Sequence, residues 1–370
     1  EMAMALVGIA LIVVTTTGNA MVCLAVLLVR TLKQPPNFLL VSLAVADFFV
    51  GCIVMPLALV SLLSPEWPLG RLACKLWTTS DLVLCTASIV NLCMISVDRY
   101  LVISRPLRYA AQRTAKRIMW YIVVVWVIAA MVSISSLLLP PLLGIEDKSD
   151  TCEVPQHLGY QIYATMISFY VPTLIMVIVY AKIWRAAKRL ARQDRIIGAD
   201  MYKNVNKTIP DRIPLPSKRV SGSSQHSDGK DEKKLLHRPS AIINTIKFHH
   251  SRHSTEHHQR SENKAQKTLG VMMGIYIICW LPFFLLALIK PLSGGGTVVP
   301  EWLDTLCLWL GYSNSMLNPM IYCKYNKEFR LPFREMLSCR FSTLQNVMRQ
   351  EEFTNKFGVL KCPRRAESIG

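Results

Sequence analysis

The sequence predicts an all-α membrane protein, a bundle of seven transmembrane helices. Of its 370 residues, 52% are hydrophobic, and the mean hydropathy is +0.31. A soluble domain rarely reaches this mean hydropathy while it also carries a long, very basic polar stretch. The excess comes from separate apolar runs, and Lys and Arg fall almost entirely on one side of them, which indicates a polytopic membrane protein.

Seven apolar runs are long enough to cross the hydrocarbon core of a bilayer, which takes about 20 helical residues. Because seven is an odd number, the two ends of the chain lie on opposite sides of the membrane. The predicted spans are residues 5–29, 38–63, 73–98, 118–140, 159–183, 267–289 and 302–323.

The distribution of Lys and Arg sets the orientation. The connections after spans one, three and five, together with the segment after span seven, hold 38 of the 42 Lys and Arg residues. Since positively charged loops stay on the inner side, we expect a cytoplasmic C-terminus and a multi-pass protein of the plasma membrane. The net charge of +18 then reflects topology and attraction to anionic membrane lipid, and no nucleic-acid partner is expected.

A long polar insertion separates spans five and six. It is basic and has few large apolar side chains, so it cannot bury a core, and we predict a largely disordered cytoplasmic loop whose two ends extend the neighbouring helices. The predicted organisation is residues 1–183 for helices one to five, 184–263 for this third loop, 264–323 for helices six and seven, 324–339 for an amphipathic helix and 340–370 for a cytoplasmic tail.

The amphipathic helix is predicted from four apolar residues that fall on one helical face, at spacings of i, i+4, i+7 and i+8. They are Phe329, Phe333, Met336 and Leu337. Pro332 lies inside this pattern and weakens it. Cys339 ends the segment beside the inner leaflet and is a candidate for palmitoylation.

Cysteine usage predicts one disulfide. The chain has 11 cysteines, of which nine fall within the predicted spans or on the cytoplasmic side. Only Cys74 and Cys152 lie on the oxidising side, so the predicted pair is Cys74–Cys152. This bond would attach the loop between spans four and five to the outer end of span three.

Asp81 is a carboxylate inside an otherwise apolar span. A charge at that depth costs roughly 2.5–3.5 kcal/mol on insertion scales, so it usually faces a cavity and has a functional partner. Arg99 follows 18 residues later, which is about five helical turns, so both side chains lie on nearly the same face, about 27 Å apart. One helix with an anion near its outer end and a cation at its inner end suits a protein that binds a cation outside and reports it inside.

Short motifs occur in a fixed order on these spans, and together they identify a family. Each motif alone is weak, but the whole set in order leaves little room for chance. The chain resembles the class A, rhodopsin-like G-protein-coupled receptors over essentially its whole length, which implies a receptor and not an enzyme. The motifs are Gly18-Asn19, Leu43-Ala44-Val45-Ala46-Asp47, Asp98-Arg99-Tyr100, Trp126, Pro172 with Tyr180, Cys279-Trp280-Leu281-Pro282-Phe283-Phe284 and Asn318-Pro319-Met320-Ile321-Tyr322.

The resemblance implies an amine-binding site around Asp81. In biogenic-amine receptors the matching Asp pairs with the ammonium group of the ligand, and Tyr312 matches a tyrosine that hydrogen-bonds this Asp. Trp309, one turn earlier, is expected to wall the same pocket, and the aromatic set Trp280, Phe283 and Phe284 suits a flat ring that carries a cation. The remaining expected ligand-binding residues are Cys85, Thr86, Ala164, Thr165 and Ser168.

The far wall of the site resembles that of serotonin receptors, particularly type 6. Ala164 stands where catecholamine receptors usually carry a serine, while Thr165 and Ser168 leave hydroxyls for an indole N–H or a phenol. The stretch 85–100 is similar to types 6 and 7. Octopamine, tyramine and dopamine remain alternative ligands.

The family also implies an internal sodium site and an inner switch. The sodium site would be Asp47 with Ser88, Asn314, Ser315 and Asn318, a hydrated polar cluster being the alternative. In the switch, Arg99 is expected to pair with Asp98 and with Glu262 at the start of span six. Tyr276 replaces a phenylalanine that is usual in the family, so its hydroxyl needs a partner. The remaining switch residues are Tyr100, Pro319 and Tyr322.

The implied partners are a protonated amine, a heterotrimeric G protein, arrestin, a receptor kinase and membrane lipid. Types 6 and 7 suggest a stimulatory G protein and rising cyclic AMP, with inhibitory coupling as the alternative. A transporter would need repeated halves, which the sequence lacks. A light sensor would need a lysine where Tyr312 stands, and an intramembrane enzyme would need a histidine within a span. No cofactor is expected apart from the sodium ion as a modulator.

Overall fold

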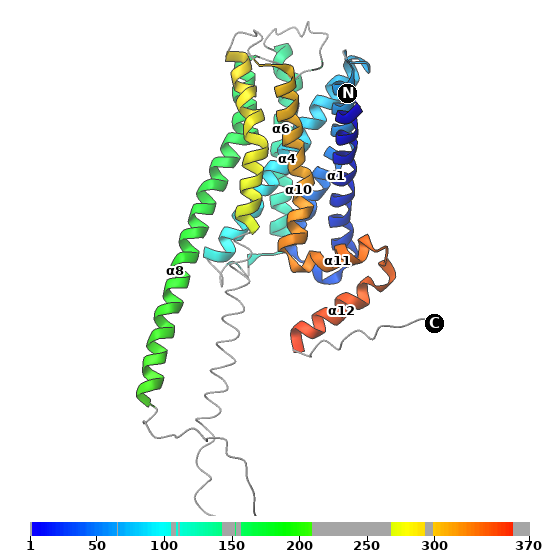
Figure 1. Ribbon diagram of the computed structural model, residues 1–370. Coiled ribbons are helices and arrows are strands. Elements are labelled where there is room, and N and C mark those ends of the chain that lie inside the picture. Colours follow the sequence, from blue (N-terminus) through cyan, green and yellow to red (C-terminus); the bar gives the residue numbers. More distant parts are fainter. Residues whose placement is uncertain are drawn as a thin grey trace, which may run out of the picture. The chain divides into compact units, whose positions relative to one another are not determined.

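The structure, a computed structural model of the chain, describes residues 2–64, 66–104, 109, 112–142, 152, 157–208, 268–292 and 299–357. The chain divides into two compact units, Glu1–Ile183 with Lys267–Gly370, and Trp184–Gln266. Every element among the described residues is helical (Figure 1). Six of these helices are long and apolar enough to cross a membrane.

The helices follow the predicted order and are mostly a few residues longer than the predicted spans. The fifth is much longer and runs to Thr208, beyond the short extension expected for it. The elements are α1 (Met2–Leu28), η1 (Arg30–Leu32), α2 (Pro35–Phe49), η2 (Val50–Val54), α3 (Met55–Leu63), α4 (Gly70–Ser104), α6 (Ala115–Leu142), α7 (Leu158–Thr165), η3 (Met166–Tyr170), α8 (Val171–Thr208), the helix Thr268–Leu292, α10 (Glu301–Tyr325), α11 (Lys327–Leu337) and α12 (Phe341–Phe357).

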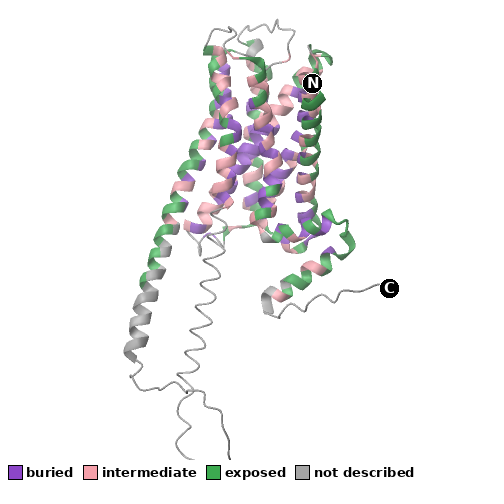
Figure 2. Cartoon of the chain, in the orientation of Figure 1, coloured by how far each residue is buried: buried purple, intermediate pink, exposed green. Residues whose placement is uncertain are grey.

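The helix α4 is the central helix of the first unit. In its most apolar window 67% of the residues are buried, compared with 28% for α1, and the buried residues gather in the middle of the bundle (Figure 2). A cluster of mostly small residues from α2, α4 and α6 forms part of this core, and small side chains let helix backbones approach closely. The cluster consists of Ala46, Ala87, Val90, Val125 and Ala129.

Two of the membrane helices are interrupted by a single wide turn, η2 in the second span and η3 in the fifth. Both are π-helical segments of five residues. Each lies just before a proline, Pro56 or Pro172, whose ring would clash with the carbonyl four residues earlier. Those carbonyls belong to Cys52 and Ser168, inside η2 and η3, so the wider turn relieves the clash.

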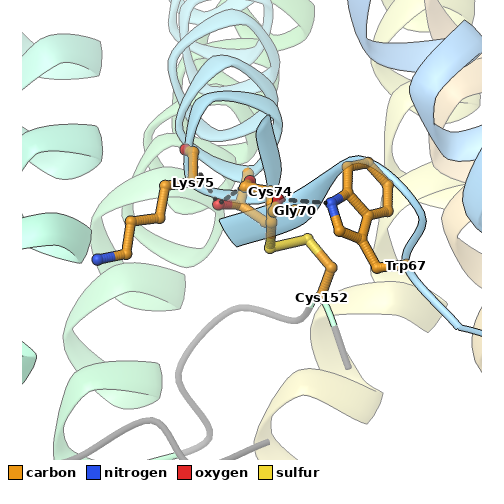
Figure 3. The surroundings of a disulfide bond; sticks show 6 residues. Trp67, Gly70, Cys74, Lys75 and Cys152 are labelled. Carbon is orange, nitrogen blue, oxygen red and sulfur yellow. Dashed lines mark hydrogen bonds between the residues drawn. A yellow bond between two sulfur atoms is a disulfide. The ribbon is translucent and has the colours of Figure 1, made fainter. Parts of the chain in front are cut away.

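The predicted disulfide is confirmed. Cys74 near the start of α4 is bonded to Cys152, with 5.6 Å between their Cα atoms (Figure 3). The same end of α4 is held by Trp67, whose indole Nε1 donates to the Gly70 carbonyl at 2.9 Å. Gly70 has a φ of +75°, a left-handed conformation that favours glycine. The first turns of the central helix are therefore held by a disulfide and by this hydrogen bond.

The predicted amphipathic helix is α11, and it continues through Pro332. Phe329, Phe333 and Met336 are buried within the protein, whereas Leu337 is 74% exposed. Leu337 is the last residue of the helix, where no further turn covers it. The helix α12 lies within the segment that sequence reasoning assigned only as a tail. Within the predicted third loop, residues 209–263 lie outside the described residues, as does Glu262.

Candidate ligand-binding site

A cavity lies among α4, α7, η3, the helix Thr268–Leu292 and α10. Its empty space, including the open solvent at its mouth, is about 1100 Å³. It extends from Trp280 to the end of the bundle that carries Cys152. Its lining is Trp77, Thr78, Asp81, Leu82, Cys85, Thr86, Ile89, Cys152, Gln161, Ala164, Thr165, Ser168, Trp280, Phe283, Phe284, Ala287, Lys290, Asp304 and Leu308.

Asp81 is the anionic group deep in this cavity. Its carboxylate accepts hydrogen bonds from the Cys85 thiol, with 3.1 Å from Sγ to Oδ1, and from the Tyr312 hydroxyl, with 3.2 Å from Oη to Oδ2. No Lys or Arg among the described residues lies within ion-pair distance of it. A buried carboxylate with two long neutral donors and no cation is poorly compensated, so it favours a cationic ligand.

Aromatic rings form the wall opposite Asp81. Trp280 lies edge-on to Phe283, with 6.0 Å between ring centroids, and is tilted against Phe284 at 5.8 Å. Phe284 is in turn stacked on Phe169, with 4.4 Å between centroids and 9° between planes. Phe169 is buried in η3 and fixes the position of Phe284 from behind. The wall is therefore rigid, and its ring faces are suited to a flat or cationic ligand.

Hydroxyl groups line the wall formed by α7 and η3. Thr165 Oγ1 donates to the Gln161 carbonyl at 2.7 Å, within its own helix. Ser168 Oγ accepts from Thr86 Oγ1 at 3.2 Å, across to α4. Thr165 therefore has lone pairs left over, while Ser168 retains its own hydrogen. Side by side, the wall offers one acceptor and one donor.

A second carboxylate, Asp47, lies in the polar core of the bundle and is fully buried. Its Oδ1 accepts from the hydroxyls of Ser88 and Ser315, both at 2.8 Å, and its Oδ2 accepts from Asn318 Nδ2 at 2.7 Å. Four of the five residues expected to form a cation site therefore share one hydrogen-bonded cluster. The fifth, Asn314, directly precedes Ser315 on α10 and is buried, and both of its side-chain polar atoms lack a hydrogen-bond partner among the described residues.

At the inner end of α4, Asp98 does not pair with Arg99 as predicted. Its carboxylate is bound by the Arg113 guanidinium, which forms a two-point ion pair. It also accepts from Tyr109 Oη at 3.0 Å. Burial and the adjacent Asp98 charge raise the pKa of Tyr109, so this phenol remains protonated as a donor. Arg99 carries the same guanidinium, but adjacent residues on a helix point about 100° apart, whereas Arg113 approaches from another segment and contacts both carboxylate oxygens.

Three other predicted switch residues, Tyr276, Tyr322 and Tyr100, differ in the contacts that they make. The hydroxyl of the buried Tyr276 lies 2.9 Å from Thr173 Oγ1 on α8, which supplies the partner that the substitution for phenylalanine required. The Tyr322 hydroxyl is buried with no hydrogen-bond partner among the described residues, and its ring packs on Phe329 of α11. The Lys182 ammonium lies over the ring of Tyr100, 5.9 Å from its centroid.

Comparison with known proteins decides the family. The model of the family "7 transmembrane receptor (rhodopsin family)" matches residues 18–322. This chain belongs to that family. It is therefore a multi-pass membrane protein and a receptor rather than an enzyme, and α10 is its seventh membrane helix. Although α10 is not among the six most apolar spans, its polar residues face the core of the bundle.

Several relatives of this receptor are named as serotonin (5-hydroxytryptamine) receptors. The chain is 38% identical to 5-hydroxytryptamine receptor 1 of Drosophila melanogaster over 90% of its own length, and spans 63% of that protein. It is 34% identical to receptor 7 of Xenopus laevis, with 98% and 83% of the two chains covered. It is 33% identical to receptor 1A-alpha of Takifugu rubripes, with 90% and 87% covered. The predicted family resemblance is confirmed, while types 1 and 7 both stand among the relatives.

The structure brings most of the predicted ligand-site residues of this receptor together. Nine of the eleven line the cavity. Tyr312 does not line it, but its hydroxyl donates a hydrogen bond to Asp81, which does. Trp309 does not line it. Its ring packs edge-on to Tyr312 and lies close to Gly8 of α1. Trp309 precedes Tyr312 by three residues, which is about 300° of rotation around the helix axis. The two side chains therefore point about 60° apart, and they do not share the same face of α10.

Sequence reasoning missed several cavity residues of the receptor. On α4 they recur on the same helical face as Asp81, at i−4, i−3 and i+8, so periodicity could have found Trp77, Thr78 and Ile89. Lys290 and Asp304 gave no comparable signal, since charged residues are ordinary at the ends of membrane helices.

Proposed function

We propose that this receptor binds a protonated biogenic amine, with serotonin as the first candidate, and activates a heterotrimeric G protein at the plasma membrane, with its C-terminus in the cytoplasm. The observation that carries the proposal is Asp81, a carboxylate without a cationic partner among the described residues, at the side of an aromatic-walled cavity. The ammonium group would bind to Asp81, and a charge-assisted bond in such a place is strong.

Serotonin is proposed because of the hydroxyl wall. Its indole N–H needs an acceptor and its phenol oxygen can use a donor, and the lone pairs of Thr165 and the hydrogen of Ser168 match these needs. Ala164 offers neither, which disfavours a catechol. The names of the relatives support the same ligand. Octopamine, tyramine and dopamine are the alternatives that the test must separate.

Binding would act on the bundle through Trp280. This residue lines the cavity and also packs against Gly311, where a Cβ would come within 2.7 Å of its ring. An amine that fits better when Trp280 and the helix Thr268–Leu292 have shifted would favour the shifted state. The population change is limited by the difference between the ligand's affinities for the two states. No chemical step is required of the chain.

We propose stimulatory coupling, with rising cyclic AMP, on the similarity of residues 85–100 to types 6 and 7. Inhibitory coupling is the second candidate, because relatives of type 1 and type 7 have similar identities. Arrestin and a receptor kinase would act on the cytoplasmic side, as the family implies. Membrane lipid would contact α11, and palmitate on the exposed Cys339 would anchor its end.

We also propose that Asp47 holds a sodium ion that modulates the receptor. Hard cations prefer oxygen ligands, and the hydroxyls of Ser88 and Ser315 already converge on its carboxylate. The buried amide of Asn314 has an oxygen without a partner among the described residues, which a cation could use. The donor set therefore fits sodium, whose charge would offset that of the buried carboxylate.

The test is cyclic AMP in cells that express the full chain, after serotonin, octopamine, tyramine and dopamine in parallel. A rise led by serotonin is the expected result. A fall with serotonin would keep the ligand and replace the G protein with an inhibitory one. A response led by another amine would replace the ligand, and silence to all four with confirmed surface expression would point to another amine or to a pathway other than cyclic AMP.

A further inference from the structure

An ion pair lies at the outer rim of the cavity. Lys290, near the end of the helix Thr268–Leu292, is bonded to Asp304 in the first turn of α10, with 2.7 Å from Nζ to Oδ2. Both residues line the cavity that holds Asp81. Their side chains are 26% and 34% exposed, so the pair is in contact with water. It connects the outer ends of the sixth and seventh helices beside the cavity mouth.

The charges of the rim pair cancel. Among the described residues that line the cavity, Lys290, Asp304 and Asp81 are the charged ones. With Lys290 bound to Asp304, the charges of these two residues offset each other, and Asp81 is the third charged group in this lining. A half-exposed ion pair contributes little to stability, so the fold does not depend on it. The location of the Lys290–Asp304 pair beside the cavity, rather than its contribution to stability, indicates its role.

We propose that the Lys290–Asp304 ion pair is a gate at the rim of the cavity that slows both entry and release of the amine. The inference rests on the proposed amine function and adds to it a control of exchange rate. A ligand that passes the rim moves against two side chains held together between two helices. Opening the pair removes this connection between the two helix ends and lets them separate more easily, so entry and release accelerate together while the affinity changes little.

The measurement is the association and dissociation rate of radiolabelled serotonin on membranes that contain the full chain. We compare the original chain with Lys290→Ala, with Asp304→Ala and with the exchanged pair Lys290→Asp/Asp304→Lys. Each single change is expected to raise both rates by about two- to fivefold, the range that corresponds to one half-exposed ion pair. The exchanged pair restores the contact and is expected to return both rates toward the original values.

Glu301→Ala is the matched control, because Glu301 is an exposed acid in the same first turn of α10 and does not line the cavity. It is expected to leave both rates unchanged. If the two single changes instead shift association in opposite directions with release unaltered, the residues act only through their charges and the gate is wrong.

Failure of the gate and failure of the proposed function are distinguishable. Serotonin binding with rates that none of the variants alters would contradict the gate alone. If serotonin does not bind the original chain but another of the four amines does, the same rates are measured with that amine. Absence of binding by all four would overturn the amine function and the gate with it.

Discussion

The two carboxylates buried in this bundle have contrasting surroundings. Asp47 receives three short hydrogen bonds, at 2.7–2.8 Å, from side chains of two other helices, α4 and α10. Asp81 receives two longer ones, at 3.1 and 3.2 Å, and one of these comes from a thiol, which is a weak donor. Asp81 also borders open space, whereas Asp47 does not line the cavity. A buried charge that the fold itself satisfies belongs to the core, and one left with weak donors beside a cavity is available to a ligand.

Substituting each carboxylate by its amide tests this contrast most directly. Asp81→Asn removes the charge that faces the amine, and we expect the affinity for serotonin to fall by roughly 100-fold or more, as for loss of one partner of a buried charge pair. Asp47→Asn is the matched change in the core and is expected to alter this affinity by less than about tenfold. Competition binding on membranes measures both. Equal losses, or amine affinity that survives Asp81→Asn, would contradict the assigned ligand site.

The sodium proposal sharpens the comparison from the side of Asp47. In the original receptor, exchange of sodium for a large organic cation is expected to change agonist affinity by about tenfold, within the usual range of coupling between two sites. Asp47→Asn should make the affinity independent of sodium, because the ion loses the only charged ligand in the cluster. Asp81→Asn cannot serve as the control, because it is expected to remove the amine affinity that this experiment measures. The control is Asn91→Ala, which changes another buried amide on α4. A sodium effect that persists in Asp47→Asn would rule out this site.

Trp280 lies where the cavity meets the core, and two glycines test its packing. A Cβ at Gly311 would come within 2.7 and 2.8 Å of the Trp280 ring, whereas a Cβ at Gly274 would meet nothing within 4 Å. Gly311→Ala is therefore expected to displace the ring, to lower the free energy of unfolding by about 1–3 kcal/mol and to weaken amine binding. Gly274→Ala should stabilise its helix by about 0.5–1 kcal/mol. Thermal unfolding in detergent and ligand affinity distinguish the two, and a Gly311→Ala protein that behaves like Gly274→Ala would show that the ring has room to move.

Much of the fold and the centre of the site could be predicted because membrane burial leaves strong signals. Apolar runs stand out against polar loops, and a lone carboxylate such as Asp81 stands out within an apolar run. The disulfide followed from topology, since only two cysteines remained on one side of the membrane.

What could not be predicted depends on contacts that have no sequence period. Arg113 reaches Asp98 from outside the regular helices, so nothing in the sequence pairs the two. Phe169 lies in η3, and the wide turn there changes which residues face inward. Trp309 was placed one turn from Tyr312 on the correct helix, but the angular step between them turns it away from the cavity.

The smallest expected effect concerns Cys339, whose backbone adopts a conformation that favours glycine. Cys339 has a φ of 55°, a left-handed conformation that costs most residues about 1–2 kcal/mol. It follows α11 in a C-terminal cap, where the Cys339 amide donates to Met336 and the Arg340 amide to Glu335, both at 2.9 Å. Glycine is the usual residue at this position, so an exposed cysteine here is consistent with selection for its thiol rather than for its backbone.

Cys339→Gly and Cys339→Ala separate the two contributions of this residue. Both changes should abolish incorporation of labelled palmitate, if the thiol is the acceptor. Only Cys339→Gly removes the Cβ that makes the left-handed conformation unfavourable, so we expect it to stabilise the end of α11 by about 0.5–1 kcal/mol. The measurement is slower hydrogen exchange of the backbone amides at positions 339 and 340. Because alanine keeps the Cβ, Cys339→Ala should leave this exchange near its original rate. Equal protection in the two variants would mean that the cap carries no strain and that the thiol alone distinguishes this position.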